Sequence, residues 1–142
     1  MRDWPVTRTR LRRWVQSALF VDARLTLRLV GRAEAIALNR SFRRRDYAPN
    51  VLTFVYPDHD TGGAAAKPQP TICAADIVLC LPVLREEARL QGKALENHLA
   101  HLVIHGVLHA QGYDHQRAAQ ARRMEALETS LLARLRIPDP YR

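Results

Sequence analysis

Cysteine is scarce in this chain, with two among 142 residues. Cys73 and Cys80 lie seven positions apart in one apolar run that predicts a single strand. An odd separation points their side chains to opposite faces, and the strand rise places them roughly 23 Å apart. Because that distance is far beyond the reach of a disulfide, we expect two buried thiols in a reducing compartment. Their spacing is also too wide for a C-x-x-C metal site.

Long hydrophobic runs are missing as well. No stretch approaches the roughly 20 apolar residues that a membrane-spanning helix needs. The first segment, Met1–Arg13, is rich in arginine, and the apolar segment of a signal peptide does not follow it. The sequence therefore predicts a cytoplasmic protein without a membrane partner.

Acidic residues are too few to balance the basic ones. Fourteen Asp and Glu stand against 22 Lys and Arg, which gives a formal net charge of +8. Such an excess raises the local concentration of polyanions by long-range attraction. RNA, DNA or an acidic membrane surface would each satisfy it. A solvated basic surface without a partner is the alternative that charge alone leaves open.

The periodicity of the chain predicts one α+β domain over residues 1–142. We expect a small mixed sheet of three to four strands, packed with about five helices, and a metal-binding helix in the core. A surface loop is expected over residues 57–70. The expected strands are Arg24–Val30, Asn50–Tyr56 and Thr71–Cys80, the last one central, and the expected helices are Thr9–Phe20, Ala33–Ser41, Pro82–Gln91, Lys93–Gln111 and Arg117–Leu135.

The strongest chemical motif is the run HGVLHAQGYDH, which begins at His105. His105 and His109 are four positions apart, so on a helix both imidazoles leave the same face, about 6 Å apart along the axis. Gly112 can take a positive φ and reverse the chain, which lets His115 return to the same point. Three neutral imidazoles with a fourth position open are typical of a catalytic zinc site. The spacing therefore predicts one metal ion held by the three histidines.

Other polar residues around this motif have more than one interpretation. His101, one turn before His105, is expected to support the site through a hydrogen bond or to make a purely structural one. Asp114 is expected either to orient a histidine or to cap the helix that follows. His98 and His59 are expected to be solvated or structural.

The same run also fits the H-x-x-x-H-x-x-G-x-x-H skeleton of the metzincin peptidases. Those enzymes carry a glutamate general base directly after the first histidine. Here that position is Gly106, which has no side chain. Met124 lies inside an expected helix, which does not suggest the methionine turn of that class. A metzincin-like metallopeptidase is therefore the weaker enzymatic hypothesis.

Three segments, in the right order, resemble the YbeY family of bacterial endoribonucleases that act in ribosomal RNA maturation. LNRSFRRRDYAPNVLTFVYP, residues 38–57, is similar to the family's LN-x-x-[YF]-R-x-x-D-x-P-T-[DN]-V-L-S-F-P. Ala75–Ile77 is similar to its G-D-I strand, and HGVLHAQGYDH to its H-G-x-L-H-x-x-G-Y-D-H signature. The resemblance covers about Leu25–His115, with Ala48 and Pro49 replacing the family's Pro-Thr pair.

This resemblance implies site residues and a cofactor. It implies metal ligands at His105, His109 and His115. It also implies a functional arginine at Arg43, whose guanidinium can grip a phosphodiester through two hydrogen bonds. Arg44 and Arg45 are expected either to contact neighbouring phosphates or to be solvated. The expected cofactor is one zinc ion per chain, although three imidazoles also suit other divalent transition metals.

The function that the resemblance implies is a zinc-dependent endoribonuclease with a preference for single strands. Its expected roles are maturation of the 3′ end of 16S ribosomal RNA and ribosome quality control. The expected partners are single-stranded RNA, ribosomal RNA, and the small ribosomal subunit or its assembly proteins. A non-catalytic ribosome-assembly factor with a structural metal is the hypothesis from a different class.

Overall fold

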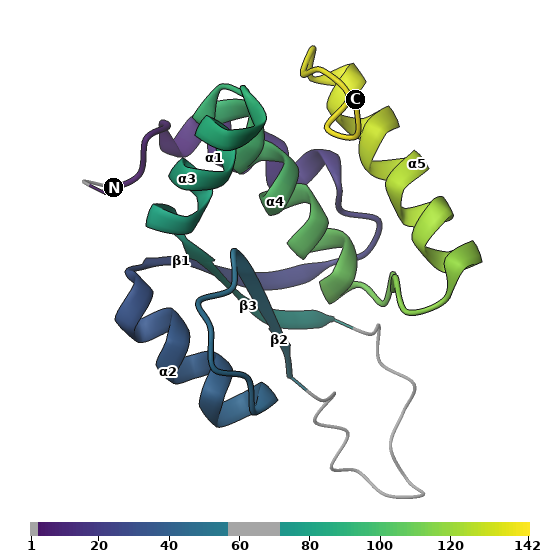
Figure 1. The fold of residues 1–142 in the computed structure, drawn as a ribbon. Coiled ribbons are helices and arrows are strands. Elements are labelled where there is room, and N and C mark those ends of the chain that lie inside the picture. The colour runs from purple at the N-terminus through teal and green to yellow at the C-terminus, as the bar shows by residue number, and fades with distance from the viewer. Residues whose placement is uncertain (1–2, 57–71) are drawn as a thin grey trace, which may run out of the picture.

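The computed structural model describes residues 3–56 and 72–142, and within them the chain forms a three-stranded sheet with helices on both faces (Figure 1). Helix α2 covers one face of the sheet and α4 covers the other, while α1, α3 and α5 pack around α4. The elements are α1 (Arg8–Ser17), β1 (Ala23–Val30), α2 (Arg32–Arg43), β2 (Val51–Val55), β3 (Cys73–Cys80), α3 (Leu81–Gln91), α4 (Leu95–Ala110) and α5 (Ala118–Arg134).

The predicted α+β class, with a small mixed sheet and five helices, is confirmed for the described residues. The bounds of the helices differ from the prediction by up to three residues. Helix α1 ends at Ser17, three residues early, and α2 runs two residues further, so that Arg43 is its last residue. The predicted loop over residues 57–70, which includes His59, lies outside the described residues.

Strand β3 is the centre of the sheet because its residues are apolar on both faces. It pairs in parallel with β1 and antiparallel with β2, in the order β1-β3-β2. Its last four residues, from Ile77 to Cys80, are all buried. Strand β1 instead alternates, with leucines turned towards the core and Arg24, Thr26 and Arg28 exposed, as expected of an edge strand with one covered face.

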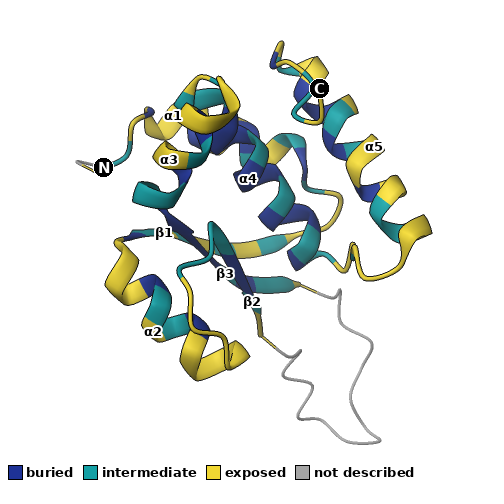
Figure 2. Cartoon of the chain, in the orientation of Figure 1, coloured by how far each residue is buried: buried dark blue, intermediate teal, exposed yellow. Residues whose placement is uncertain are grey.

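The two faces of the sheet hold two separate cores (Figure 2). The smaller one lies under α2 and contains Val30, Ala35, Leu52, Val78 and Cys80. The larger one surrounds α4, which has ten buried residues and is the most buried helix. The expectation that the histidine-bearing helix runs through the core is therefore confirmed.

Helix α1 is fixed to α4 at both of its ends. Near its start, Arg10 forms an ion pair with Glu96. Beyond its end, the Gln111 side chain donates to the carbonyl of Ala18 and accepts from the backbone N–H of Phe20, both at 2.7 Å. The two helices therefore run side by side in the same direction.

Both cysteines are free, as predicted from their spacing. The predicted burial is confirmed for Cys80 but not for Cys73, which is half-buried at the start of β3 with its thiol 3.1 Å from the carbonyl oxygen of Ala110. Among the helices in residues 3–56 and 72–142, none combines the length and the apolarity needed to span a bilayer.

Candidate metal centre

The end of α4 and the loop after it gather three imidazole rings. The ring centroids of His105 and His109 are 6.4 Å apart, with the rings nearly parallel. His115 comes from the loop, and its centroid lies 5.5 Å from His105 and 5.9 Å from His109. Gly112 has a φ of +102°, so the predicted reversal of the chain at this residue is confirmed. The three histidines that the spacing singled out therefore lie at one point of the surface.

Hydrogen bonds on the far side of two rings fix which nitrogen faces this point. Nδ1 of His105 donates to the Glu128 carboxylate at 2.6 Å, and Nδ1 of His109 donates to the carbonyl of Tyr113 at 2.9 Å. A carbonyl only accepts, so the proton of His109 must sit on Nδ1. The Nε2 atoms of both rings then keep a free lone pair. This donor set fits a divalent transition metal, because ligand histidines usually donate their second N–H to an oxygen.

Asp114 lies beside this group. Its carboxylate and the ring nitrogens of His109 and His115 fall within 4.8 Å of one another, close enough to share one ion. One carboxylate oxygen also accepts from the backbone N–H of His115 at 2.7 Å. The alternative that Asp114 caps α5 is wrong, because α5 begins after Arg117 and has no side-chain cap. Asp114 therefore adds negative charge at the point where the histidines converge.

Glu128 links α5 to the histidines, and the sequence reasoning missed it. Its side chain is fully buried, and besides His105 its carboxylate accepts from Nε2 of His101 at 3.3 Å and from the hydroxyl of Tyr141. His101 was expected to support the site through a hydrogen bond or to make a purely structural one. In the structure its hydrogen bond is to the Glu128 carboxylate, which also holds His105. A signal was present in the sequence, because Glu128 follows Met124 by one turn on the apolar face of α5.

Burial and hydrogen bonds act in opposite directions on Glu128. Burial by itself raises the pKa of the carboxyl, but the hydrogen bonds from His101, His105 and Tyr141 outweigh it and lower the pKa to about 2. The carboxylate is therefore ionised at neutral pH and can only accept. Burial lowers the pKa of His109, which favours the neutral ring that a metal requires.

Gly106 sits where α4 touches the sheet. A Cβ atom at this position would lie 2.8 Å from Cγ2 of Ile77 and 3.5 Å from Oγ1 of Thr53. A side chain fits there only if the side chain of Ile77 repacks or α4 moves, so packing disfavours the glutamate that metzincins carry at this position. The structure therefore weakens the peptidase hypothesis further.

The first arginine of the predicted site, Arg43, lines a surface hollow. This hollow is formed by the end of α2, the start of β2 and α3, and also contains Asn39, Asn50 and Glu87. None of the three histidines lines it.

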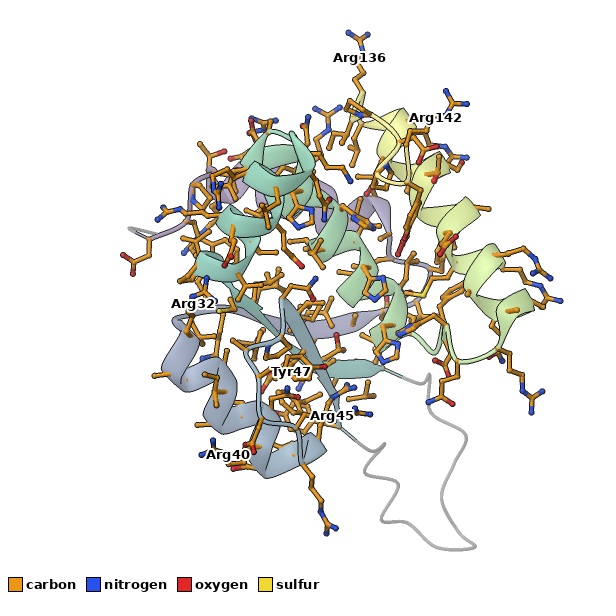
Figure 3. All side chains as sticks on the ribbon, viewed as in Figure 1. Arg32, Arg40, Arg45, Tyr47, Arg136 and Arg142 are labelled. Atoms are coloured by element: carbon orange, nitrogen blue, oxygen red, sulfur yellow. The ribbon has the colours of Figure 1, made fainter. Side chains whose placement is uncertain are left out.

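Arg44 and Arg45 are exposed and follow Arg43 directly. Arg44 ends α2 with a left-handed conformation at a φ of 55°, and the backbone N–H of Arg45 donates to the carbonyl of Asn39 at 3.3 Å. Figure 3 shows Arg45 and Tyr47 on the segment between α2 and β2.

His98 belongs to the interior and not to the metal centre. It is 4% exposed, and its Nε2 lies 3.0 Å from the carboxylate of Glu87. Of the two interpretations of His98, the structural one is confirmed.

Comparisons with known proteins agree on one family. The family model described as Endoribonuclease YbeY matches residues 4–136. The chain is 53% identical over 136 residues to Endoribonuclease YbeY of Herminiimonas arsenicoxydans, covering 96% of this chain and 85% of that protein. It is 53% identical over 149 residues to Endoribonuclease YbeY of Bordetella pertussis, covering 98% and 89%. The solution structure of TM1509 from Thermotoga maritima is similar with a TM-score of 0.53 at 26% identity, covering 91% of this chain and 81% of that one.

Proposed function

The chain belongs to the Endoribonuclease YbeY family, and on this premise we propose that it is a metal-dependent endoribonuclease. We propose further that it cleaves single-stranded RNA in the cytoplasm and acts in 16S ribosomal RNA 3′-end maturation and ribosome quality control. Ribosomal RNA and the small ribosomal subunit or its assembly proteins are then its partners. The observation that carries the proposal is the convergence of three imidazoles, two of which, His105 and His109, keep a free Nε2 lone pair for an ion.

In this proposal His105, His109 and His115 hold a single zinc ion, with Asp114 beside them. Such an ion supplies a Lewis acid for the phosphodiester. Glu128 fixes the ring of His105, and the Tyr113 carbonyl fixes the ring of His109, so that both imidazoles are held in the geometry for binding before the metal arrives.

Arg43 is proposed to bind a phosphate of the substrate. Its hollow includes Val51 and Leu52 of β2, and the next residue of that strand, Thr53, faces Gly106 between two of the histidines. An RNA strand that contacts both Arg43 and the metal centre would therefore run across β2. Arg44 and Arg45 are exposed beside this path and are proposed to contact neighbouring phosphates.

The test is cleavage by zinc-loaded protein of single-stranded RNA, duplex RNA and casein, with and without chelator. We expect cleavage of single-stranded RNA that the chelator abolishes. Cleavage of casein without cleavage of RNA would reverse the proposal in favour of a peptidase. Zinc binding without any cleavage would favour an assembly factor with a structural metal.

Two kinds of variant separate the roles. His109→Ala and His115→Ala should each lose stoichiometric zinc and RNA cleavage together, and zinc retained at one per chain in both would refute the ligand assignment. Arg43→Ala should keep zinc and lower kcat/KM by about tenfold or more. Arg40→Ala is the matched control, since Arg40 is exposed on the same helix and pairs with Asp46.

A further inference from the structure

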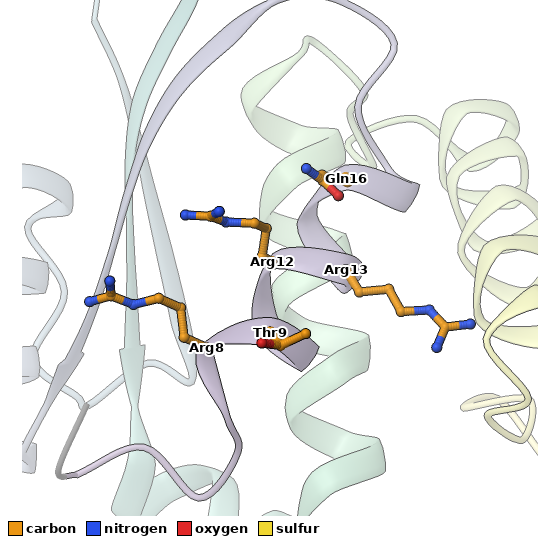
Figure 4. Close-up of a pocket in the computed structure, with 5 residues that line it drawn as sticks. All are labelled: Arg8, Thr9, Arg12, Arg13 and Gln16. Carbon is orange, nitrogen blue, oxygen red and sulfur yellow. The ribbon is translucent and has the colours of Figure 1, made fainter.

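Helix α1 carries an exposed row of arginines, Arg8, Arg12 and Arg13, which we call the α1 arginine face. With Thr9 and Gln16 they line a shallow hollow on the surface (Figure 4). In that view Arg8 and Arg12 extend to the same side of the helix and Arg13 extends to the other. The helix contains no acidic residue, so it offers no carboxylate of its own to neutralise them.

Packing holds these arginines at the surface. Leu11 and Trp14 of the same helix are buried in the main core, which turns the opposite side of α1 to solvent. Arg10 is an instructive contrast, because it pairs with Glu96 and its guanidinium lies 5.8 Å from the ring centroid of Trp14. In the part of the chain that the structure describes, the arginines of the α1 arginine face form no ion pair with a carboxylate.

The spacing of the face suits a chain of phosphates. Arg8 and Arg12 are one turn apart, a rise of about 6 Å, which is comparable to the separation of successive phosphates along a nucleic-acid strand. Like charges four residues apart repel each other on a helix, and a bound polyanion would relieve this repulsion. Guanidinium groups also match the phosphate oxygens in geometry, since each can donate two parallel hydrogen bonds.

The face lies apart from the metal centre. Helix α1 runs along α4, with Arg10 beside Glu96 near the start of α4, while His109 stands near its end. The rise of α4 between Glu96 and His109 is about 20 Å, and Arg13 lies about 5 Å nearer to His109 along the axis than Arg10 does. A ligand that reaches from Arg8 to the histidines must therefore be several nucleotides long.

We propose that the α1 arginine face binds the phosphate backbone of RNA outside the metal centre and holds a long substrate while another part of it is cleaved. The proposal rests on the proposed function for the identity of the polyanion. An anionic membrane is the less suitable partner, because the largest apolar residues of α1, Leu11 and Trp14, are buried in the core and do not face lipid.

The test compares RNA affinity with and without the face. Fluorescence anisotropy of a single-stranded RNA of about 30 nucleotides is measured with chelator-treated protein, so that no cleavage intervenes, over a series of salt concentrations. The variant R8A/R12A/R13A should bind about tenfold more weakly at low salt, and the slope of log affinity against log salt should fall by about two. Alanine favours the helix, and circular dichroism checks that the fold is kept.

The matched control, R28A/R32A/R89A, removes three exposed positive charges from other surfaces. Arg28 and Arg32 are paired with carboxylates on the surface, and such exposed pairs contribute little to stability. The control should change RNA affinity by less than about twofold. Equal losses in the two variants would overturn the proposal, because they would show that only net charge matters.

Two further measurements keep this proposal distinct from the nuclease assignment. With zinc-loaded protein, R8A/R12A/R13A should raise KM for the long RNA and retain kcat, and an unchanged KM would count against the face. Sedimentation with phosphatidylserine vesicles tests whether the partner is a membrane. If R8A/R12A/R13A lost binding to the vesicles but kept the RNA affinity of the wild type, the proposal would be overturned in favour of a membrane. Wild-type protein that binds RNA through the face but cleaves none would refute only the nuclease.

Discussion

The carboxylate of Glu128 on α5 accepts a hydrogen bond from Nδ1 of His105 on α4 at 2.6 Å, although 23 residues separate the two in sequence. Because Nδ1 is engaged, the ring of His105 can present only Nε2 to the loop that carries His115. The same carboxylate accepts from Tyr141 near the C-terminus. The geometry of the metal centre therefore depends on how α5 and the C-terminal residues pack against α4.

Glu128→Gln tests this dependence. The substitution keeps the size of the side chain but removes its negative charge, so His105 is held less firmly and its ring becomes a weaker ligand. We expect zinc affinity, measured by competition with a chelating dye, to fall about 10- to 100-fold. Glu125→Gln, on the exposed side of the same helix, is the control and should leave affinity unchanged. An equal affinity in the two variants would show that Glu128 does not position the ligand.

Gly106→Ser tests the contact between α4 and the sheet. Its Cβ would fall 2.8 Å from Ile77, so the helix must move or the side chain of Ile77 must repack. We expect a loss of about 1–3 kcal/mol in the free energy of unfolding, measured in urea. Gly31→Ser is the control, because a Cβ there meets nothing within 4 Å and serine suits the first cap of α2. A similar urea midpoint for both variants would contradict the close contact.

Gly112→Ala tests the reversal of the chain that returns His115. The φ of +102° is a conformation that residues with a side chain rarely adopt, so we expect a loss of stability of about 1–2 kcal/mol together with weaker zinc binding. Gly92→Ala imposes a similar strain at a φ of +64° beyond the end of α3. It should lose stability while keeping zinc affinity. If it weakened zinc binding as much, the reversal at Gly112 would have no specific role.

The two thiols provide a prediction about pH. Burial raises the pKa of Cys73, so at pH 8 a smaller fraction is thiolate than in an exposed cysteine. Cys80 is 1% exposed and inaccessible in the folded protein. Reaction with a thiol reagent at pH 8 should therefore be slow in native protein, should speed up at Cys73 as the pH rises, and should reach two thiols per chain in denaturant. Two thiols that react at once in native protein would contradict both placements.

The sequence by itself determined the local features of this protein. The i, i+4 spacing of His105 and His109 fixes their common face because the helix has 3.6 residues per turn. A glycine that tolerates a positive φ explains the turn towards His115. Alternation along β1 likewise predicted a strand with one buried face, and the apolar run of β3 predicted a central strand, since side-chain direction in a strand alternates with every residue.

Only the tertiary structure decided which residues from distant parts of the sequence contact each other. Nothing in the spacing around Glu128 says that its carboxylate reaches His105, because that contact depends on the packing of α5 against α4. The close approach of Gly106 to Ile77 depends in the same way on how α4 lies on the sheet. The hollow that Arg43 lines was equally hidden, since it is formed by α2, β2 and α3 together. Local periodicity fixes the direction in which a side chain points, and the partner it meets is fixed by the packing of distant segments.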